Sequence, residues 1–136
     1  MTWRVGFNTR WGCIHSVFGG TVTTQDSDEA TVEALSLARG SVRHLFFTDL
    51  MNAESRLSIF DIYYIPEKWL AAGASKANRL VLVAPEEGKL WDDVRFYEHR
   101  CCSRGWDVKA FSCQQRAIDW LTSPLPANTP DAGDGE

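Results

Sequence analysis

Long apolar runs are absent from this sequence of 136 residues. No stretch approaches the roughly 20 apolar residues that a helix needs to cross a bilayer. The first residues, MTWRVG, do not follow the basic-then-apolar order of a signal peptide. We therefore expect no membrane insertion and a cytoplasmic location.

The sequence also has no excess of positive charge. It contains 14 Lys and Arg against 18 Asp and Glu, which gives a net charge of −4. Three of these acids, Asp131, Asp134 and Glu136, lie at the C-terminal end, so the rest of the chain is close to neutral. A nearly neutral domain has no electrostatic basis for binding nucleic acid, and we expect none bound.

Cysteine is scarce, and its spacing does not indicate a redox or zinc motif. None of the four cysteines forms a C-x-x-C pair. Cys101 and Cys102 are adjacent, and neighbouring side chains do not easily reach disulfide geometry with each other. We expect all four to be free thiols in a reducing compartment.

Two pairs of residues could in principle bind a metal ion. Cys13 and His15 share one face of a predicted strand, and His99 and Cys102 share one face of a predicted helix. Four such ligands hold zinc tetrahedrally only where the pairs meet in space. The pairs are unconnected in sequence, so we expect neither a metal nor another cofactor.

Common catalytic motifs are missing as well. The sequence contains no G-x-G-x-x-G, G-x-x-x-x-G-K-[ST], G-x-S-x-G or H-E-x-x-H. This argues against the nucleotide-binding, hydrolase and zinc-protease families, and we expect a protein that is not an enzyme. One enzymatic alternative stays open, an acid–base pair of Asp49 and Glu86 at the carboxyl ends of parallel strands.

The composition that is present is typical of a globular domain. The chain is 44% hydrophobic, with six Trp, three Tyr and seven Phe. A chain of this length buries roughly two-thirds of the surface that it exposes when unfolded. We expect one domain over residues 1–123. The remaining residues, 124–136, are rich in Pro, Gly and acids, and this composition predicts a disordered tail.

Alternating patterns predict five strands and four helical segments. The first two strands are expected at Trp3–Asn8 and Cys13–Thr23, joined by a turn at Gly12. Three further strands are predicted at Val42–Asp49, Arg79–Ala84 and Asp107–Phe111.

Capping patterns locate the helices. Asp26 and Glu29 predict the start of the first helix, which Gly40 should end, and Ser58 and Asp61 predict the start of the second. The second helical segment, Ser58–Gly73, contains Pro66, which should kink it or begin another short helix. A third helix is expected from Leu90 to Gly105. Ser112 and Gln115 should cap the last one.

The resulting order is β-β-α-β-α-β-α-β-α, which predicts an α/β domain with a five-stranded mixed sheet. The first strand should be antiparallel at one edge. Right-handed crossovers should collect the helices on one face, which leaves an apolar second face for another element, a ligand or a second subunit to cover. A homodimer is the cover that we favour here.

Several segments resemble the small bacterial SpoIIAA-like proteins. They are G-G-T-V-T (19–23), H-L-F-F-T-D-L (44–50), L-S-I-F-D-I-Y-Y-I-P (57–66), R-L-V-L-V-A (79–84) and R-G-W-D-V-K-A-F (104–111). These proteins are relatives of the STAS domain of anti-sigma factor antagonists and share a fold with CRAL-TRIO lipid-binding domains. The resemblance covers residues 3–122. It implies a β-α superhelix with strands in sequential order and a regulatory or binding role.

The resemblance also marks one serine. In the antagonists, a strand that ends in Asp is followed by a D-S-S-G loop whose serine is phosphorylated at the start of the next helix. Here the strand ends at Asp49 and the nearest positional match to that serine is Ser58. The D-S-S-G motif itself is absent.

Phe60, Tyr63 and Tyr64 crowd the second helical segment. Aromatic side chains of this kind either pack in the core or rim a hydrophobic site or partner surface. Together with Asp49 and Ser58 they are the candidate binding residues.

We therefore expect a non-catalytic regulatory or binding domain for a protein partner or a small apolar ligand. The alternatives are a lipid or fatty-acid carrier like the CRAL-TRIO domains and a small enzyme that uses Asp49. An enclosed apolar pocket favours a carrier, an exposed apolar patch a partner-binding module, and a polar cleft with convergent Asp, Glu or His an enzyme.

Overall fold

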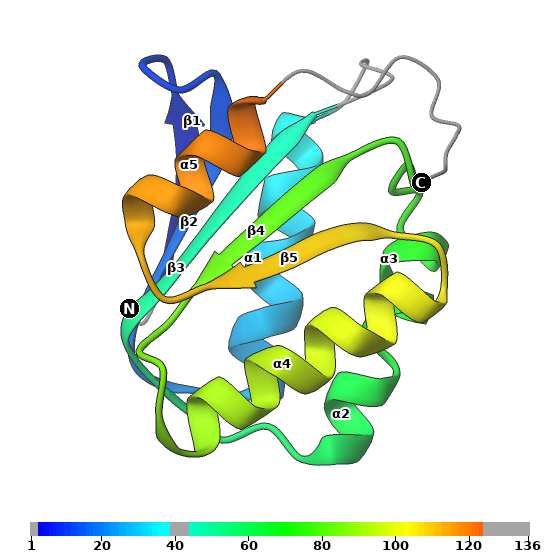
Figure 1. The fold of residues 1–136 in the computed structure, drawn as a ribbon. Coiled ribbons are helices and arrows are strands. Elements are labelled where there is room, and N and C mark those ends of the chain that lie inside the picture. Colours follow the sequence, from blue (N-terminus) through cyan, green and yellow to red (C-terminus); the bar gives the residue numbers. More distant parts are fainter. Residues whose placement is uncertain (1–2, 39–43, 124–136) are drawn as a thin grey trace.

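A single mixed sheet of five strands organises the molecule (Figure 1). The computed structural model describes residues 3–38 and 44–123. The strands lie in the order β1-β2-β3-β4-β5, with β1 antiparallel to β2 and all other neighbours parallel. Their bounds are Trp3–Asn8 (β1), Cys13–Val22 (β2), Leu45–Ser55 (β3), Arg79–Val83 (β4) and Asp107–Phe111 (β5). The predicted sheet, its sequential order and its antiparallel edge strand are confirmed.

Helices cover both faces of this sheet. Figure 1 shows α5 in front of the sheet and α1 behind it. The helix bounds are Thr24–Leu37 (α1), Ile59–Tyr63 (α2), Ile65–Ala71 (α3), Gly88–Ser103 (α4) and Gln114–Thr122 (α5). Within the described parts of the chain, none of them is long and apolar enough to span a bilayer.

The hairpin turn between β1 and β2 is built as the sequence predicts. Gly12 has a φ of 65°, which an L side chain adopts only at a cost. Its N–H donates to the carbonyl of Asn8 over 2.8 Å, and the Asn8 side chain accepts from the N–H of Trp11. Asn8 and Gly12 therefore close the turn that sets the register of the edge strand.

The first helix begins earlier than predicted. Thr23 is the N-cap, and its hydroxyl accepts from the N–H of Asp26 while the Asp26 carboxylate accepts from the N–H of Thr23. The predicted Asp26–Glu29 box is wrong, because Asp26 is the third helical residue of a box that Thr23 opens. The expected end of this helix at Gly40 lies outside the described residues.

Strand β3 continues past Asp49, where it was predicted to end, to Ser55. The reason is its neighbour β2, which stays paired with it through Gly19↔Asn52 and Val22↔Ser55 after a register shift next to Val17. The predicted start of this strand, Val42, lies outside the described residues.

The segment from Ser58 to Gly73 divides into two short helices, α2 and α3. Pro66 lies in the first turn of α3, where its missing N–H leaves no hydrogen bond broken. Of the two effects predicted for Pro66, a kink or the start of another short helix, the structure shows the second. Ser58 is the N-cap of α2 and forms a capping box with Asp61, as predicted.

The start of the last helix, α5, differs from its prediction. Its N-cap is Cys113, which makes no side-chain capping bond. The predicted cap Ser112 instead donates from its hydroxyl to the carboxylate of Glu86 over 3.1 Å. That contact links the end of β5 to the loop that follows β4.

Two apolar cores lie on the two faces of the sheet. On one face, α1 and α4 pack Ala30 and Val94 over strand residues such as Leu80. On the other face, α5 packs Ala117 and Leu121 over Phe47, Val81 and Val83. The two cores share no residue.

The expectation that all helices lie on one face is therefore wrong for α5. This helix follows the edge strand β5, and no further strand of the described sheet follows it. The handedness rule applies only to a helix that connects two parallel strands, so it does not determine on which face of the sheet α5 packs. Burial of the apolar side chains on the otherwise uncovered face favours packing there. An element of the chain itself covers the face for which a second subunit was expected.

Candidate functional site

A cavity of about 130 Å³ lies between the sheet and the helices α1, α3 and α4. Most of the side chains that line it are apolar. Its floor comes from the sheet and includes Phe18, Leu50 and Leu82, whereas its walls include Ala34 of α1 and Trp69 of α3. The first core therefore contains space that its own side chains do not fill.

Two hydroxyl groups lie on the cavity floor. Ser16 of β2 and Thr48 of β3 are Cα partners across the parallel pair, and both line the cavity. Ser16 is only 7% exposed. Within residues 3–38 and 44–123 neither side-chain hydroxyl forms a hydrogen bond. The fully buried side-chain atoms without a partner among the described residues are Nε2 of His15 and of His44, so the Ser16 and Thr48 oxygens are instead accessible from the cavity.

An aromatic cluster forms the wall at α4. The ring of Tyr97 meets Trp69 edge-on at a centroid distance of 5.8 Å, and Trp69 meets Trp106 at 5.3 Å. Burial raises the pKa of the Tyr97 hydroxyl well above its ordinary value. The three rings of this cluster therefore carry no charge at neutral pH.

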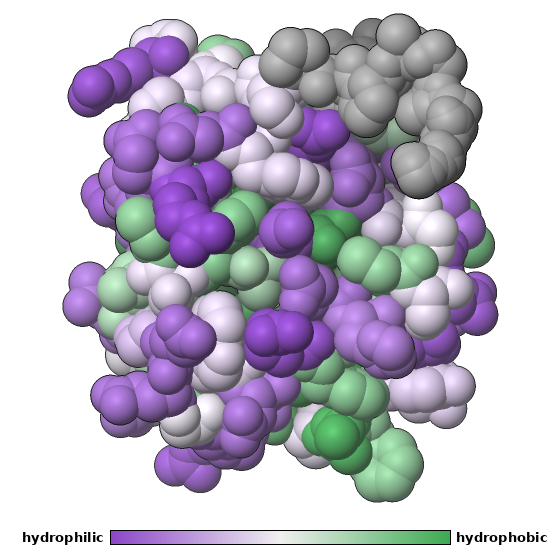
Figure 2. Space-filling model, in the orientation of Figure 1, coloured by the Kyte–Doolittle hydropathy of each residue, from purple (hydrophilic) through white to green (hydrophobic). Residues whose placement is uncertain are grey.

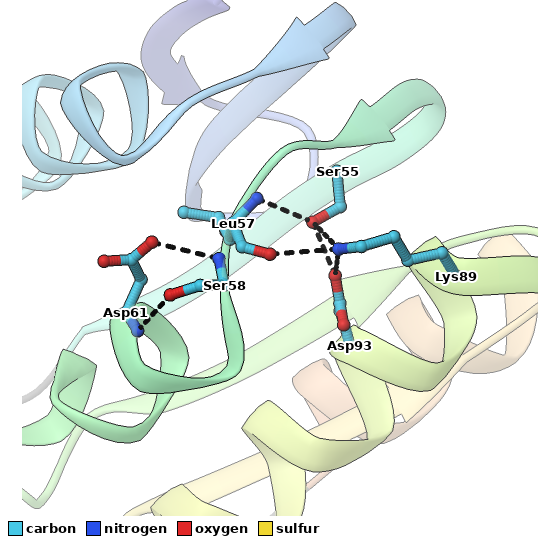
Figure 3. Close-up of polar contacts among 6 residues, drawn as sticks. All are labelled: Ser55, Leu57, Ser58, Asp61, Lys89 and Asp93. Carbon is cyan, nitrogen blue, oxygen red and sulfur yellow. Dashed lines mark hydrogen bonds and ion pairs between the residues drawn. The ribbon is translucent and has the colours of Figure 1, made fainter.

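Charged groups gather where β3 ends (Figure 3). The Ser55 hydroxyl donates to the Asp93 carboxylate over 2.6 Å, and the Lys89 ammonium donates to the same carboxylate over 2.6 Å. Lys89 also donates to the carbonyl of Leu57. Because Ser55, Leu57 and Asp93 line the cavity, this network forms one end of it.

Ser58 lies beside that network but does not line the cavity. Its side chain is exposed, accepts from the N–H of Asp61, and caps α2 (Figure 3). Hydrogen bonds from the backbone of Ser58 and from the side chains of Thr24 and Ser58 hold the pKa of Asp61 below its ordinary value. The capping box thus places α2 beside the first residue of α1.

Phe60, Tyr63 and Tyr64 lie on the outer surface of the molecule, away from the cavity. Their exposed fractions are 74%, 44% and 54%. Figure 2 shows apolar residues gathered at the lower edge of the molecule, over α2. With Ile59 and Leu70 these three residues form a surface that we name the α2 patch.

The side chain of Arg100 contacts the α2 patch at Tyr63. The guanidinium carbon of Arg100 lies 3.9 Å from the ring centroid of Tyr63, and its Nε donates to the Tyr63 carbonyl. Arg100 of α4 therefore stabilises the packing of α2 against α4 through a cation–π contact and a hydrogen bond.

Asp49 lies on the face of the sheet opposite to the cavity. Its partner on β4 is Val83, which belongs to the core under α5. The Asp49 carboxylate accepts from the N–H of Met51 over 2.9 Å, next to the register shift of β2. The proposed acid–base partner, Glu86, binds the Ser112 hydroxyl instead. Each carboxylate thus has a local structural contact.

The four candidate zinc ligands fall on different sides of the sheet. Cys13 belongs to the core under α5, whereas His99 and Cys102 are on α4, which packs on the other face. Burial raises the pKa of the Cys13 thiol to about 11. No cluster of three or more His, Cys, Asp or Glu that could hold a metal ion occurs in the described part of the chain.

Residue patterns did carry a signal for the cavity that the sequence analysis missed. Thr48 stands between Phe46 and Leu50 at alternate positions of one strand, and Ser16 stands between Ile14 and Phe18. Because alternate residues face one side of a sheet, each hydroxyl interrupts an otherwise apolar inward face. A polar residue in such a position is the informative exception in a core.

Comparisons with known proteins bear on the fold. No known family profile matches the sequence, and no curated protein matches it. A search of solved structures finds an uncharacterized protein of the DUF3478 family from Shewanella loihica PV-4, described as having a SpoIIAA-like fold. The match has a TM-score of 0.58 and 19% sequence identity, and it covers 88% of this chain and 93% of the other.

The chain has a SpoIIAA-like fold. The fold implied by the sequence motifs is confirmed over most of the domain. At this level of identity the likeness carries the architecture alone, because one fold serves many functions. Function must be argued from the cavity and the surface.

Proposed function

We propose that this domain acts without catalysis, as a binding or regulatory module that takes a small apolar ligand into the cavity between the sheet and α1, α3 and α4. The observation that carries the proposal is the cavity itself, a mostly apolar space whose floor holds the hydroxyls of Ser16 and Thr48.

The energetic cost of the cavity supports this proposal. Empty space in a closed protein core costs about 24 cal/mol per Å³, so a cavity of about 130 Å³ costs at most roughly 3 kcal/mol. Small domains have a free energy of unfolding of only about 5–15 kcal/mol. A ligand that fills the space restores lost contacts and gains affinity from them.

The size of the cavity selects among ligands. An engineered apolar cavity of about 150 Å³ in another protein holds a benzene molecule. A cavity of about 130 Å³ therefore suits one aromatic ring or a short alkyl group. Pockets for larger ligands span about 300–1,000 Å³, so a long-chain lipid needs a wider space than this one. The fatty-acid carrier alternative has less support for that reason.

The enzymatic alternative also has less support. Its residue Asp49 points to the face opposite to the cavity and already accepts a backbone N–H. Catalysis at the cavity needs groups that converge on a bound substrate. Asp49 cannot supply one there without crossing the sheet.

Benzyl alcohol provides the direct test, with binding measured by calorimetry and by the fluorescence of the cavity tryptophans Trp69 and Trp106. We expect saturable binding of one molecule per chain. Ala34→Met adds a flexible side chain at the cavity wall and should weaken binding at least about tenfold by filling the space. The matched control is Ala71→Met, an exposed position of α3.

Two results contradict the proposal. One is the absence of saturable binding to the wild-type protein. The other is equal binding to Ala34→Met and to Ala71→Met, which would locate the ligand elsewhere on the molecule.

A second function, self-association, is favoured by the α2 patch. Phe60 is 74% exposed and Ile59 57%, and adjoining apolar side chains of this kind mark interaction surfaces. We propose that the partner is a second copy of this chain, because the charged groups beside the patch are paired. Lys68 binds Asp28 over 3.0 Å, and Arg100 binds Glu67 over 3.2 Å. Two such surfaces meet without unpaired like charges, and two-fold dimers are the commonest assemblies.

Sedimentation velocity over a range of concentrations tests this second function. We expect the wild-type protein to dimerise and Phe60→Ser to remain monomeric. The control is Val32→Ser, which removes an apolar side chain that is 64% exposed but lies on α1, outside the patch. A wild-type monomer, or a Phe60→Ser dimer as stable as the wild type, contradicts it.

A further inference from the structure

We infer that the ligand of this cavity is an uncharged molecule with one hydroxyl or carbonyl group on an apolar body, and that Ser16 and Thr48 bind that group. This inference rests on the proposed function and specifies the class of ligand. It combines two observations, the charges at the cavity wall and the hydroxyl groups on its floor.

The charged side chains at the wall disfavour an anion. Among the described residues that line the cavity, the charged ones are Asp93 and Asp107, and both are acidic. Each already has a cation beside it. Lys89 contacts the Asp93 carboxylate over 2.6 Å, and Arg79 contacts the Asp107 carboxylate over 3.1 Å.

A carboxylate in the cavity would therefore lose its hydration without gaining a free cation at the lining. Burial of an unpaired ionised group is among the most unfavourable events in a protein interior. A free fatty acid or an aromatic acid fits this wall poorly, whereas the alcohol with the same carbon skeleton avoids the cost.

The hydroxyl groups on the floor favour a polar but neutral group. Ser16 and Thr48 face each other in register, and the next position in the same row of the sheet is the apolar Leu82. Ser16 is more than nine-tenths buried and has no hydrogen-bond partner in the described part of the chain. A hydroxyl both donates and accepts, so the pair can bind an alcohol or a carbonyl oxygen.

A ligand of this class can also replace the hydrogen bonds of a water molecule that occupies the same place. A polar ligand group keeps affinity only when it reproduces the hydrogen bonds of the water that it displaces. An alcohol does so at the two hydroxyls, and its apolar body fills the surrounding space at the same time.

Three ligands with one common ring test the inference: toluene, benzyl alcohol and benzoate. They differ in a methyl, a hydroxymethyl and a carboxylate group. Affinities are measured by calorimetry for the wild-type protein, for Ser16→Ala/Thr48→Val, and for Ser16→Ala/Thr48→Ser, which restores one hydroxyl.

We expect the wild-type protein to bind benzyl alcohol more tightly than toluene by up to about tenfold, the effect of a neutral hydrogen bond. Benzoate should bind more weakly than both. In Ser16→Ala/Thr48→Val the preference for benzyl alcohol should disappear while toluene affinity stays within about twofold. Unchanged toluene binding shows that this variant folds and keeps its cavity, and Ser16→Ala/Thr48→Ser should recover part of the preference.

The outcomes separate this inference from the proposed function. If none of the three ligands binds, the proposed function is wrong. If toluene binds as tightly as benzyl alcohol, or if the preference survives in Ser16→Ala/Thr48→Val, the proposed function stands and the role of the two hydroxyls is overturned. Tightest binding of benzoate, abolished by Lys89→Ala, overturns the inference by showing an anion site at Lys89.

Discussion

The guanidinium group of Arg79 stacks on the indole of Trp120, with its central carbon 4.5 Å from the ring centroid. Its Nη1 donates to the Trp120 carbonyl over 2.7 Å, and its Nε donates to the Asp107 carboxylate over 3.1 Å. The arginine side chain is only 5% exposed. One buried cation thus joins β4, β5 and the C-terminal end of α5, the helix that covers the second face of the sheet.

Removal of this cation should loosen α5. We expect Arg79→Ala to lower the free energy of unfolding by roughly 3 kcal/mol, because it removes a buried side chain together with its stacking on Trp120 and its hydrogen bonds to partly buried acceptors. Arg79→Lys should recover little of the loss, since an ammonium group lacks the planar fork that reaches several acceptors and stacks on an indole. Urea denaturation measures both effects.

The matched control for Arg79 is Arg95→Ala. Arg95 also forms an ion pair, with Glu98 over 3.0 Å, but its side chain is 59% exposed. Exposed pairs contribute at most about 1 kcal/mol. Equal losses of stability in the Ala variants of Arg79 and Arg95 would show that burial gives the first no special role.

The N-cap at Ser58 gives a second prediction. Its hydroxyl accepts from the N–H of Asp61 over 3.1 Å, and the Asp61 carboxylate accepts from the N–H of Ser58 over 3.0 Å. Ser58→Ala should therefore lower the free energy of unfolding by about 1 kcal/mol in urea denaturation. Ser58→Asn should stay near the wild type, because Asn is an equally good cap. A stable Ala variant would exclude a capping role.

The two contacts just described differ in how far the sequence predicts them. The capping box joins Ser58 to Asp61, three residues apart, and a local pattern of residue types is enough to find it. The Arg79 contact joins residues 41 positions apart, and only the packing of α5 brings them together. Local patterns thus predict the elements and some caps.

The candidate site was missed for the same reason, because local sequence patterns do not predict long-range packing. The strands that carry Ser16 and Thr48 were predicted, and so was their parallel sheet. Which apolar positions of α1 and α4 fill the space above them depends on the side-chain volumes of both helices, and a 130 Å³ gap follows from no local pattern. The exposed aromatics of α2 were predicted as a group, but whether they face the core or solvent depends on how α2 is placed.

Thiol reactivity gives a third prediction, since all four cysteines are free. Cys13 and Cys101 are each 1% exposed, and burial raises the pKa of both thiols. Cys102 and Cys113 are exposed, but burial of the sulfur also raises the pKa of Cys102. Because the thiolate is the reactive form, Cys113 should react first and Cys102 more slowly.

Labelling with a thiol-specific reagent followed by peptide mass mapping checks this order. Cys13 and Cys101 should be modified only after the protein unfolds in urea, which serves as the control for their accessibility. Rapid modification of Cys13 in the folded protein would show that α5 opens readily from the second face of the sheet.

The last prediction concerns the pH dependence of stability. Burial lowers the pKa of His15 below its ordinary value of 6.5; the carboxylate of Asp49 opposes this shift, and Arg4 adds to it. The imidazole lies edge-on to Phe47 at a centroid distance of 5.0 Å. Its Nε2 is buried and has no hydrogen-bond partner within the described residues. The Asn8 Nδ2 lies 3.5 Å from Nδ1 and donates to it, so an added proton goes to Nδ1. Protonation therefore charges a partly buried ring and removes this hydrogen bond.

A histidine whose pKa is lower in the folded than in the unfolded state stabilises the fold above its unfolded pKa. This contribution is lost as the pH falls through the folded value. Between about pH 7.5 and about pH 5 the free energy of unfolding should fall, and it should fall less in His15→Phe, which keeps an aromatic ring without a titrating group. Urea denaturation at both pH values measures the difference. Equal losses in both proteins would mean that the pKa of His15 does not change on folding.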